Sequence, residues 1–196
     1  TVRLAGPSEP AGPTGKSVAA ITTPISEVMK RCNTDSANLY AESLLKSMGH
    51  AVTKEPGSWK NGASVLRMVL SQKLGPDQAA RVTIADGSGL SRDNAVSAEA
   101  LARWLEVMGR DRSVRDMFAE SLASPGEGTL RERFRGDKIG THICAKSGFI
   151  NGVRTLSGYA IDEASGRRVA FSVMVNDIKT DTQTLASKEL TSRSRC

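Results

Sequence analysis

The sequence predicts an α+β fold in which a series of helices precedes an antiparallel sheet. Two observations lead to this prediction. Residues 23–122 hold helix-capping residues that are followed by apolar residues at helical spacing. Residues 141–175 instead show the alternation and β-branched content of strands, with a hairpin loop at 162–166. A last helix is expected over about 181–190.

The N-terminal stretch 1–20 is rich in Gly, Pro, Ser and Ala, which is typical of a linker or an extended lead-in. Residues 21–196 are therefore expected to form the folded part. The first helix is expected to begin at Thr23-Pro24, because Thr can cap a helix and Pro is tolerated at the first helical position. It should end near Arg31.

Turn-forming residues follow this helix at 33–36, and all of them readily bond their own backbone. A second helix is expected over 38–48, with Leu39, Leu44, Leu45 and Met48 on one stripe and Gly49 as its stop. The tripeptide Ser36-Ala37-Asn38 is therefore predicted to lie on a bend between two helices. Such a bend can hold polar side chains rigidly.

The remaining elements follow from caps, apolar spacing and breakers. Helices are expected over 58–75, beginning at Ser58, over 97–108, capped by Ser97, and over 114–122. A short strand is expected over 81–85, and strands are expected over 141–145, 153–161 and 168–175. Turns are expected at 86–89 and 125–128, where Gly, Pro and Asp cluster.

The composition suits a globular domain, since 39% of the 196 residues are hydrophobic and 24% are charged. No apolar run approaches the roughly 18 residues that span a bilayer. The net charge of +6 arises from basic residues scattered among acidic ones, with two Trp and two Tyr in the chain. This pattern argues against a nucleic-acid partner.

The cysteines and histidines do not suggest a metal site. None of the cysteines forms a C-x-x-C pair, and both histidines are isolated. These residues are Cys32, Cys144, Cys196, His50 and His142. No metal or other cofactor is therefore expected.

The two tripeptides that suggest a function are Ser36-Ala37-Asn38 and Lys146-Ser147-Gly148, which lie far apart in the chain. They match two of the three motifs Ser-x-x-Lys, Ser-x-Asn and Lys-Thr-Gly of penicillin-binding proteins and serine β-lactamases. Taken singly, a Ser-x-Asn before a helix is usually a cap, and a strand lysine is usually solvated. Their order and local setting favour an active site.

The second tripeptide suits acyl transfer because it is predicted to lie on a strand. Gly148 lacks a side chain, so a substrate backbone can lie alongside and pair as an added strand. The backbone N–H of Phe149 can then donate to the reacting carbonyl oxygen. Ser147 and Lys146 offer a hydroxyl and a cation to a terminal carboxylate.

The first tripeptide supplies complementary groups from the helix bend. The Ser36 hydroxyl can pass a proton, and the Asn38 amide can bond a substrate amide. Together the two tripeptides supply most of what a serine acyltransferase needs, apart from the attacking serine.

The chain resembles the class C low-molecular-mass penicillin-binding proteins, which are D-alanyl-D-alanine carboxypeptidases/endopeptidases of bacterial cell-wall metabolism. The resemblance covers roughly residues 20 to 180. Five blocks agree in sequence and order, namely Asn33–Glu42, Asp86–Asn94, Gly128–Phe134, Ala145–Gly148 and Leu156–Tyr159.

The resemblance implies a penicilloyl-serine transferase fold, with an antiparallel sheet and helices on both of its faces. It implies hydrolysis of the terminal D-Ala-D-Ala bond of peptidoglycan stem peptides through an acyl-enzyme, and covalent inhibition by β-lactams. It also implies export to the periplasm or cell surface. Carried over by position, Ser36 is the proton relay, Asn38 the substrate-amide ligand, and Lys146 the cation near both Ser36 and the substrate carboxylate.

The chain departs from the family pattern in two ways. Ser147 replaces the usual Thr and keeps its hydroxyl. The nucleophile motif Ser-x-x-Lys, which the family places upstream of Ser-x-Asn, is missing from that position. The match at Ser43-Leu44-Leu45-Lys46 follows Ser-x-Asn and falls within a predicted helix. The chain is therefore expected to be the C-terminal portion of the enzyme, with the N-terminal part of the same protein supplying the serine.

Two other functions fit part of this pattern. A class A β-lactamase also needs a deacylating Glu, which such enzymes carry in Glu-x-x-x-Asn, and no Glu here is followed by Asn at that spacing. A non-catalytic module that binds penicillin or wall peptide is the other alternative. The sequence upstream of this chain distinguishes the enzyme from the binding module, because a Ser-x-x-Lys there supports the enzyme and its absence supports the module.

Overall fold

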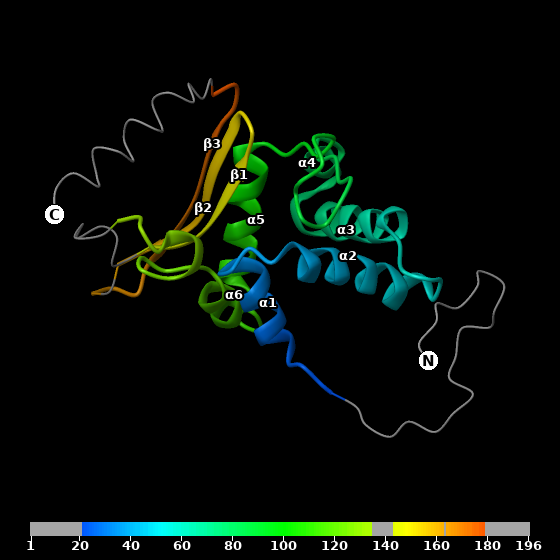
Figure 1. The fold of residues 1–196 in the computed structure, drawn as a ribbon, viewed down its shortest axis with the longest axis horizontal. Coiled ribbons are helices and arrows are strands. Elements are labelled where there is room, and N and C mark those ends of the chain that lie inside the picture. The colour runs from blue at the N-terminus through cyan, green and yellow to red at the C-terminus, as the bar shows by residue number, and fades with distance from the viewer. Residues whose placement is uncertain (1–20, 135–142, 163, 179–196) are drawn as a thin grey trace, which may run out of the picture.

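Helices lead into a three-stranded antiparallel sheet in the computed structural model, which describes residues 21–134, 143–162 and 164–178 (Figure 1). This order confirms the α+β prediction. The elements are α1 (Ile25–Asn33), α2 (Asn38–Thr53), α3 (Trp59–Leu74), α4 (Pro76–Ala80), α5 (Ala98–Arg110), α6 (Arg115–Ser121), η1 (Gly128–Leu130), β1 (Ile143–Ile150), β2 (Val153–Ile161) and β3 (Arg168–Val175). The predicted lead-in 1–20 and the predicted helix 181–190 lie outside the described residues.

The sheet has the order β1-β2-β3, and all its pairs are antiparallel. The bounds of β2 and β3 are those that the alternation predicts. The strand predicted over 141–145 is longer than expected, because β1 continues to Ile150 and pairs with β2 throughout. Lys146 therefore lies opposite Ser157 in the middle of the β1–β2 pair.

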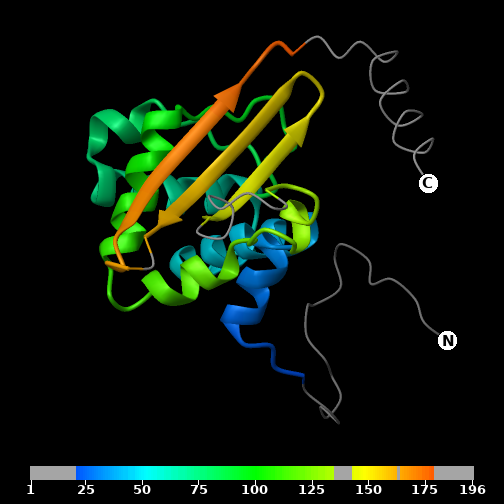
Figure 2. The same cartoon turned by 90° about the vertical axis from the view of Figure 1, so that its left-hand side faces the viewer.

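Helices α5 and α6 cover one face of the sheet (Figure 2). Leu105 of α5 and Leu122, just beyond α6, pack there against Cys144 and Tyr159. The Tyr159 hydroxyl donates a hydrogen bond of 2.6 Å to the Leu105 carbonyl, and burial raises the pKa of Tyr159 to about 12. In the described ranges no α-helix covers the opposite face, which packs against Leu130 of η1.

Helices α2 and α3 pack against each other and extend away from the sheet (Figure 1). The predicted stop at Gly49 is wrong, since α2 runs through it to Thr53. A Cβ at Gly49 would lie 2.7 Å from the Gly62 nitrogen and would overlap the Asn61 side chain. This glycine therefore allows a close approach of α3. The predicted stripe also holds only in part, because Leu45 is buried while Leu39 is 76% exposed.

Two helix starts agree with the sequence prediction. Ser58 and Asn61 form a reciprocal capping box at the start of α3, and the Ser97 hydroxyl accepts from the Ala100 N–H at the start of α5. The short strand predicted over 81–85 is reduced to one bridge between Thr83 and Ala95.

Candidate active site

The bend between α1 and α2 is anchored to the end of α6. The buried Thr34 hydroxyl donates to the Ser121 carbonyl at 2.7 Å, and the Asn33 amide donates to the Ser121 hydroxyl at 2.8 Å. Ser36 follows with a φ of 57°, in the left-handed region that favours glycine. This conformation costs about 1–3 kcal/mol. The anchored bend holds Ser36 in it.

Residues of η1 also support this bend. The Thr129 N–H donates to the Thr34 carbonyl at 3.1 Å. A Cβ at Gly128 would overlap that carbonyl oxygen and lie 2.8 Å from its carbon. Only glycine lets this loop approach Thr34 so closely, which gives the sequence block at 128–134 a structural reason.

Among the described residues, the edge of β1 away from β2 pairs with no other strand beyond the bridge at Ala145, so it is open beside this bend. Ala145 exchanges two backbone hydrogen bonds with Ala123, on the side away from β2. Because backbone groups alternate along a strand, Ser147 and Phe149 direct their N–H and C=O groups to the same side. The Phe149 N–H is therefore aimed along the open edge of β1, and its side chain is 67% exposed.

Lys146 connects the strand to the bend. Its Nζ donates to Ser36 Oγ at 2.9 Å, between residues 110 positions apart in the chain, and to the Ser147 carbonyl at 2.6 Å. Burial lowers the pKa of Lys146, because the charged amine loses contact with water. The two tripeptides that the sequence singles out thus meet through a direct side-chain contact.

A cavity of about 520 Å³ opens where these groups meet. The residues singled out from the sequence all line it, namely Ser36, Asn38, Lys146, Ser147, Gly148 and Phe149. Gly148 and Lys146 alternate onto the helix-facing side of β1. A Cβ at Gly148 would overlap the Thr155 hydroxyl, so this position keeps the strand bare beside the cavity.

Sequence reasoning did not assign roles to several other lining residues. The cavity floor is apolar and includes Leu101, Trp104, Phe118 and Leu122, from α5 and α6 and the segment that follows α6. Ser157 of β2 also lines it, and its hydroxyl lies 2.9 Å from that of Ser172. The block at 156–159 could have identified Ser157 as a lining residue.

The downstream Ser43-x-x-Lys46 match lies away from this cavity. Ser43 is exposed, and its hydroxyl donates to the Leu39 carbonyl within α2 at 2.7 Å. The Lys46 ammonium lies 3.9 Å from the centre of the Trp59 ring, a cation–π contact. Neither residue is among those that line the cavity. Their partners are those of surface helix residues.

The residues that the structure describes include no group of three His, Cys, Asp or Glu that could hold a metal ion. Cys32 and Cys144 are free thiols, and burial raises the pKa of each. His142 and Cys196 lie outside the described residues. Within the described ranges, no helix is both long and apolar enough to cross a bilayer.

Residues 9–194 match the D-Ala-D-Ala carboxypeptidase 3 (S13) family. The chain is 27% identical over 162 residues to D-alanyl-D-alanine carboxypeptidase DacB of Haemophilus influenzae, covering 82% of this chain and 33% of that protein. It is 36% identical over 160 residues to a D-alanyl-D-alanine carboxypeptidase of Actinomadura sp., covering 78% of this chain and 28% of the relative. The chain thus spans about a third of the length of these relatives.

Solved structures agree with this match. Penicillin binding protein 4 of Haemophilus influenzae, solved in complex with a β-lactam, superposes with a TM-score of 0.69 at 27% identity, over 85% of this chain and 40% of that one. A predatory endopeptidase of Bdellovibrio bacteriovorus shares the fold, with a TM-score of 0.64 at 18% identity, over 87% of this chain and 42% of that one. From the profile match and these relatives, the chain belongs to the D-Ala-D-Ala carboxypeptidase 3 (S13) family.

Proposed function

We propose that this chain forms one wall of the active site of a serine-type D-Ala-D-Ala carboxypeptidase, which acts on peptidoglycan stem peptides and is acylated by penicillin. The observation that carries the proposal is the 2.9 Å contact between Lys146 and Ser36, at a cavity beside the open edge of β1. It joins a proton-carrying hydroxyl to a half-buried cation next to a strand that can align a peptide.

On the strand side, the substrate backbone pairs with the open edge of β1 as an added strand. The Phe149 N–H donates to the carbonyl oxygen as negative charge develops on it. Lys146 and Ser147 bind the terminal carboxylate of the peptide, or the equivalent carboxylate of a β-lactam. The Ala123–Ala145 bridge supports this arrangement, because it fixes which backbone N–H and C=O groups of β1 face away from β2.

On the bend side, Ser36 relays a proton and Asn38 binds the substrate amide. As the scissile C–N bond breaks, the leaving nitrogen needs a proton, and the Ser36 hydroxyl can give one. Lys146, in direct contact with Ser36 Oγ, can replace it. The lowered pKa of Lys146 favours this transfer, since burial makes its proton easier to lose.

The attacking serine belongs to a Ser-x-x-Lys of the same protein outside these 196 residues. Support comes from Ser43, which is the one serine here with Lys three positions on and which bonds its own helix on the surface. The apolar cavity floor offers a surface on which such a segment could pack. Export to the periplasm or the cell surface is part of the proposal, because peptidoglycan lies there.

Release of D-alanine tests the proposal directly. The full-length protein, incubated with a synthetic peptide that ends in D-Ala-D-Ala, is expected to release one D-Ala per peptide and to stop after treatment with penicillin. A peptide ending in D-Ala-L-Ala is the matched control and should not be cleaved. Tight binding of the first peptide without release would contradict the proposal and indicate a wall-peptide binding module.

A further inference from the structure

We propose that Glu42 is a positioning residue that fixes the width of the cleft by holding loop 85–94 between α2 and the β1–β2 turn. The inference rests on the proposed function, since it concerns the same cleft. The loop supplies Gly87, Ser88, Gly89 and Leu90 to the cavity lining. It is the sequence block at 86–94, to which no role has been given so far.

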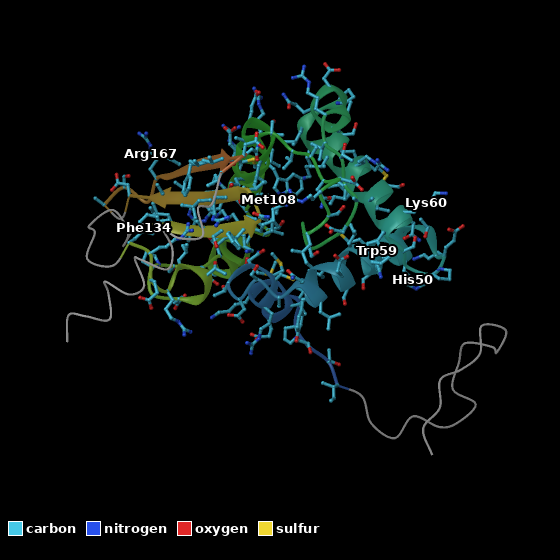
Figure 3. The ribbon with its side chains drawn as sticks, turned by 45° about the horizontal axis from the view of Figure 1, so that its top comes forward. His50, Trp59, Lys60, Met108, Phe134 and Arg167 are labelled. Carbon is cyan, nitrogen blue, oxygen red and sulfur yellow. The ribbon has the colours of Figure 1, made fainter. Side chains whose placement is uncertain are left out.

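The Glu42 carboxylate holds the near end of the loop. Its Oε2 accepts from the Gly87 N–H at 3.1 Å, and its Oε1 accepts from the Ser88 N–H at 3.1 Å. The Trp59 indole N–H donates to Oε2 at 2.7 Å, from the start of α3 beside α2 (Figure 3). Each carboxylate oxygen therefore has a backbone N–H of the loop as a partner, one turn along α2 from Asn38.

The loop is also pressed against the backbone of α2. A Cβ at Gly87 would lie 2.5 Å from the Ala41 carbonyl oxygen and 3.1 Å from Glu42 Cα. Burial raises the pKa of Glu42, but hydrogen bonds from Ser88, Trp59 and Gly87 outweigh it, so the net pKa is lowered. Glu42 therefore stays ionised as an acceptor at neutral pH.

Within the loop, two side chains take up further backbone donors. Asp86 accepts from the Gly89 N–H at 2.7 Å and the Ser91 N–H at 2.6 Å. Asn94 accepts from the Ala85 N–H at 2.8 Å and donates to Asp86 at 2.8 Å. Because these donors are occupied, the loop is a preorganised unit with little freedom to adapt on its own.

The far end of the loop reaches the sheet. The Arg92 guanidinium donates to the Asn151 carbonyl at 2.8 Å, in the turn that joins β1 to β2. Asn151 directly follows Ile150, which lines the cavity at the end of β1. The loop thus connects the helix that carries Asn38 to the strand that carries Lys146. Glu42 holds it at one end, and the Arg92–Asn151 hydrogen bond holds it at the other.

The hydrogen-bond partners of the Glu42 carboxylate among the described residues are Gly87, Ser88 and Trp59, and none of them is assigned to the reaction. Glu42 therefore acts through the loop. Gln at this position keeps the size of the side chain but turns one acceptor oxygen into an NH₂ group that faces a backbone N–H. The loop should then open more often and the two cleft walls should separate more easily. The expected loss is in formation of the complex before acylation, with little change in the acylation step itself.

Two measurements on the full-length protein test this inference, with Glu42→Gln compared with Glu99→Gln. Glu99 is the matched control because its carboxylate forms an exposed pair with Arg103 on α5. Hydrogen exchange of peptides covering 85–92 should be about tenfold faster in Glu42→Gln, since a hydrogen bond to a charged group is worth about that factor or more. The control should exchange like the wild type.

The second measurement is the kinetics of acylation by a fluorescent penicillin. Glu42→Gln should raise the apparent dissociation constant of the initial complex about tenfold, while the acylation rate constant at saturation stays near wild type. Arg92→Gln should shift the same constant in the same direction. A smaller acylable fraction with an unchanged dissociation constant would indicate a merely structural role and overturn the inference.

The two proposals fail in different ways. If the wild type itself is not acylated, the proposed function fails, and the exchange rates still decide whether Glu42 holds the loop. Unchanged exchange over 85–92 in Glu42→Gln would overturn the inference even where acylation is normal.

Discussion

Replacing Lys146 with Ala is expected to abolish acylation of the full-length protein by penicillin. The variant loses the cation that contacts Ser36 Oγ at 2.9 Å and that should bind the carboxylate of the ligand. Loss of one such electrostatic contact lowers a rate by about 10²–10³-fold, and Lys146 is given two roles. The acylation rate is measured with labelled penicillin, with Lys60→Ala on the exposed side of α3 as the control.

The fold should survive the loss of Lys146. Burial lowers its pKa from the usual value of about 10.5, so the charged amine is less favoured in the folded state than in the unfolded state. That cost is present in full below the folded pKa and disappears as the pH rises towards 10.5. At pH 7 the free energy of unfolding of Lys146→Met should therefore match or exceed that of the wild type. The difference between the two should become smaller as the pH rises towards 10.5.

Two results would contradict this account of Lys146. Normal acylation of Lys146→Ala would refute the proposed role of the lysine. If Lys146→Met lost both acylation and cooperative unfolding, the lysine would act on the fold instead of the chemistry. Circular dichroism and urea unfolding of both variants separate these cases.

Replacing Gly158 with Val is expected to give the largest loss of stability. Gly158 of β2 lies opposite Ala145 of β1, and a Cβ there would lie 2.6 Å from Ala145 Cα and overlap the Cys144 carbonyl oxygen. The strands would have to separate beside Lys146. Overpacking of this kind costs about 3 kcal/mol, and here the obstacle is backbone, which yields less than a side chain.

Urea unfolding checks this second prediction. Val173→Thr is the matched control, because Val173 lies on β3 with 55% of its surface exposed. Its free energy of unfolding should stay within about 0.5 kcal/mol of the wild type. An unfolding midpoint for Gly158→Val equal to that of the wild type would mean that the β1–β2 pair is not packed as described.

Local signals predicted much of the fold. The bounds of β2 and β3 follow from alternation, and the starts of α3 and α5 follow from Ser58 and Ser97, because these signals depend on neighbours in sequence. Gly49 misled the prediction because a glycine can end a helix or admit a neighbouring one. The choice depends on α3, whose packing is set in space.

The candidate site was predicted as two tripeptides, and the structure places their side chains in contact. What the sequence could not indicate is the framework that supports them. Thr34 bonds to the end of α6, and Glu42 bonds to Gly87 and Ser88, across 45 or more positions. A carboxylate on a helix usually faces solvent. Nothing local marks Glu42 as the acceptor of two loop N–H groups.

Mapping the penicillin adduct shows whether the attacking serine lies outside these 196 residues. The full-length protein is treated with a labelled penicillin and digested, and the modified serine is identified by mass spectrometry. A single adduct is expected, on the serine of a Ser-x-x-Lys outside these 196 residues. An adduct on Ser43, or no adduct at all, would contradict this expectation.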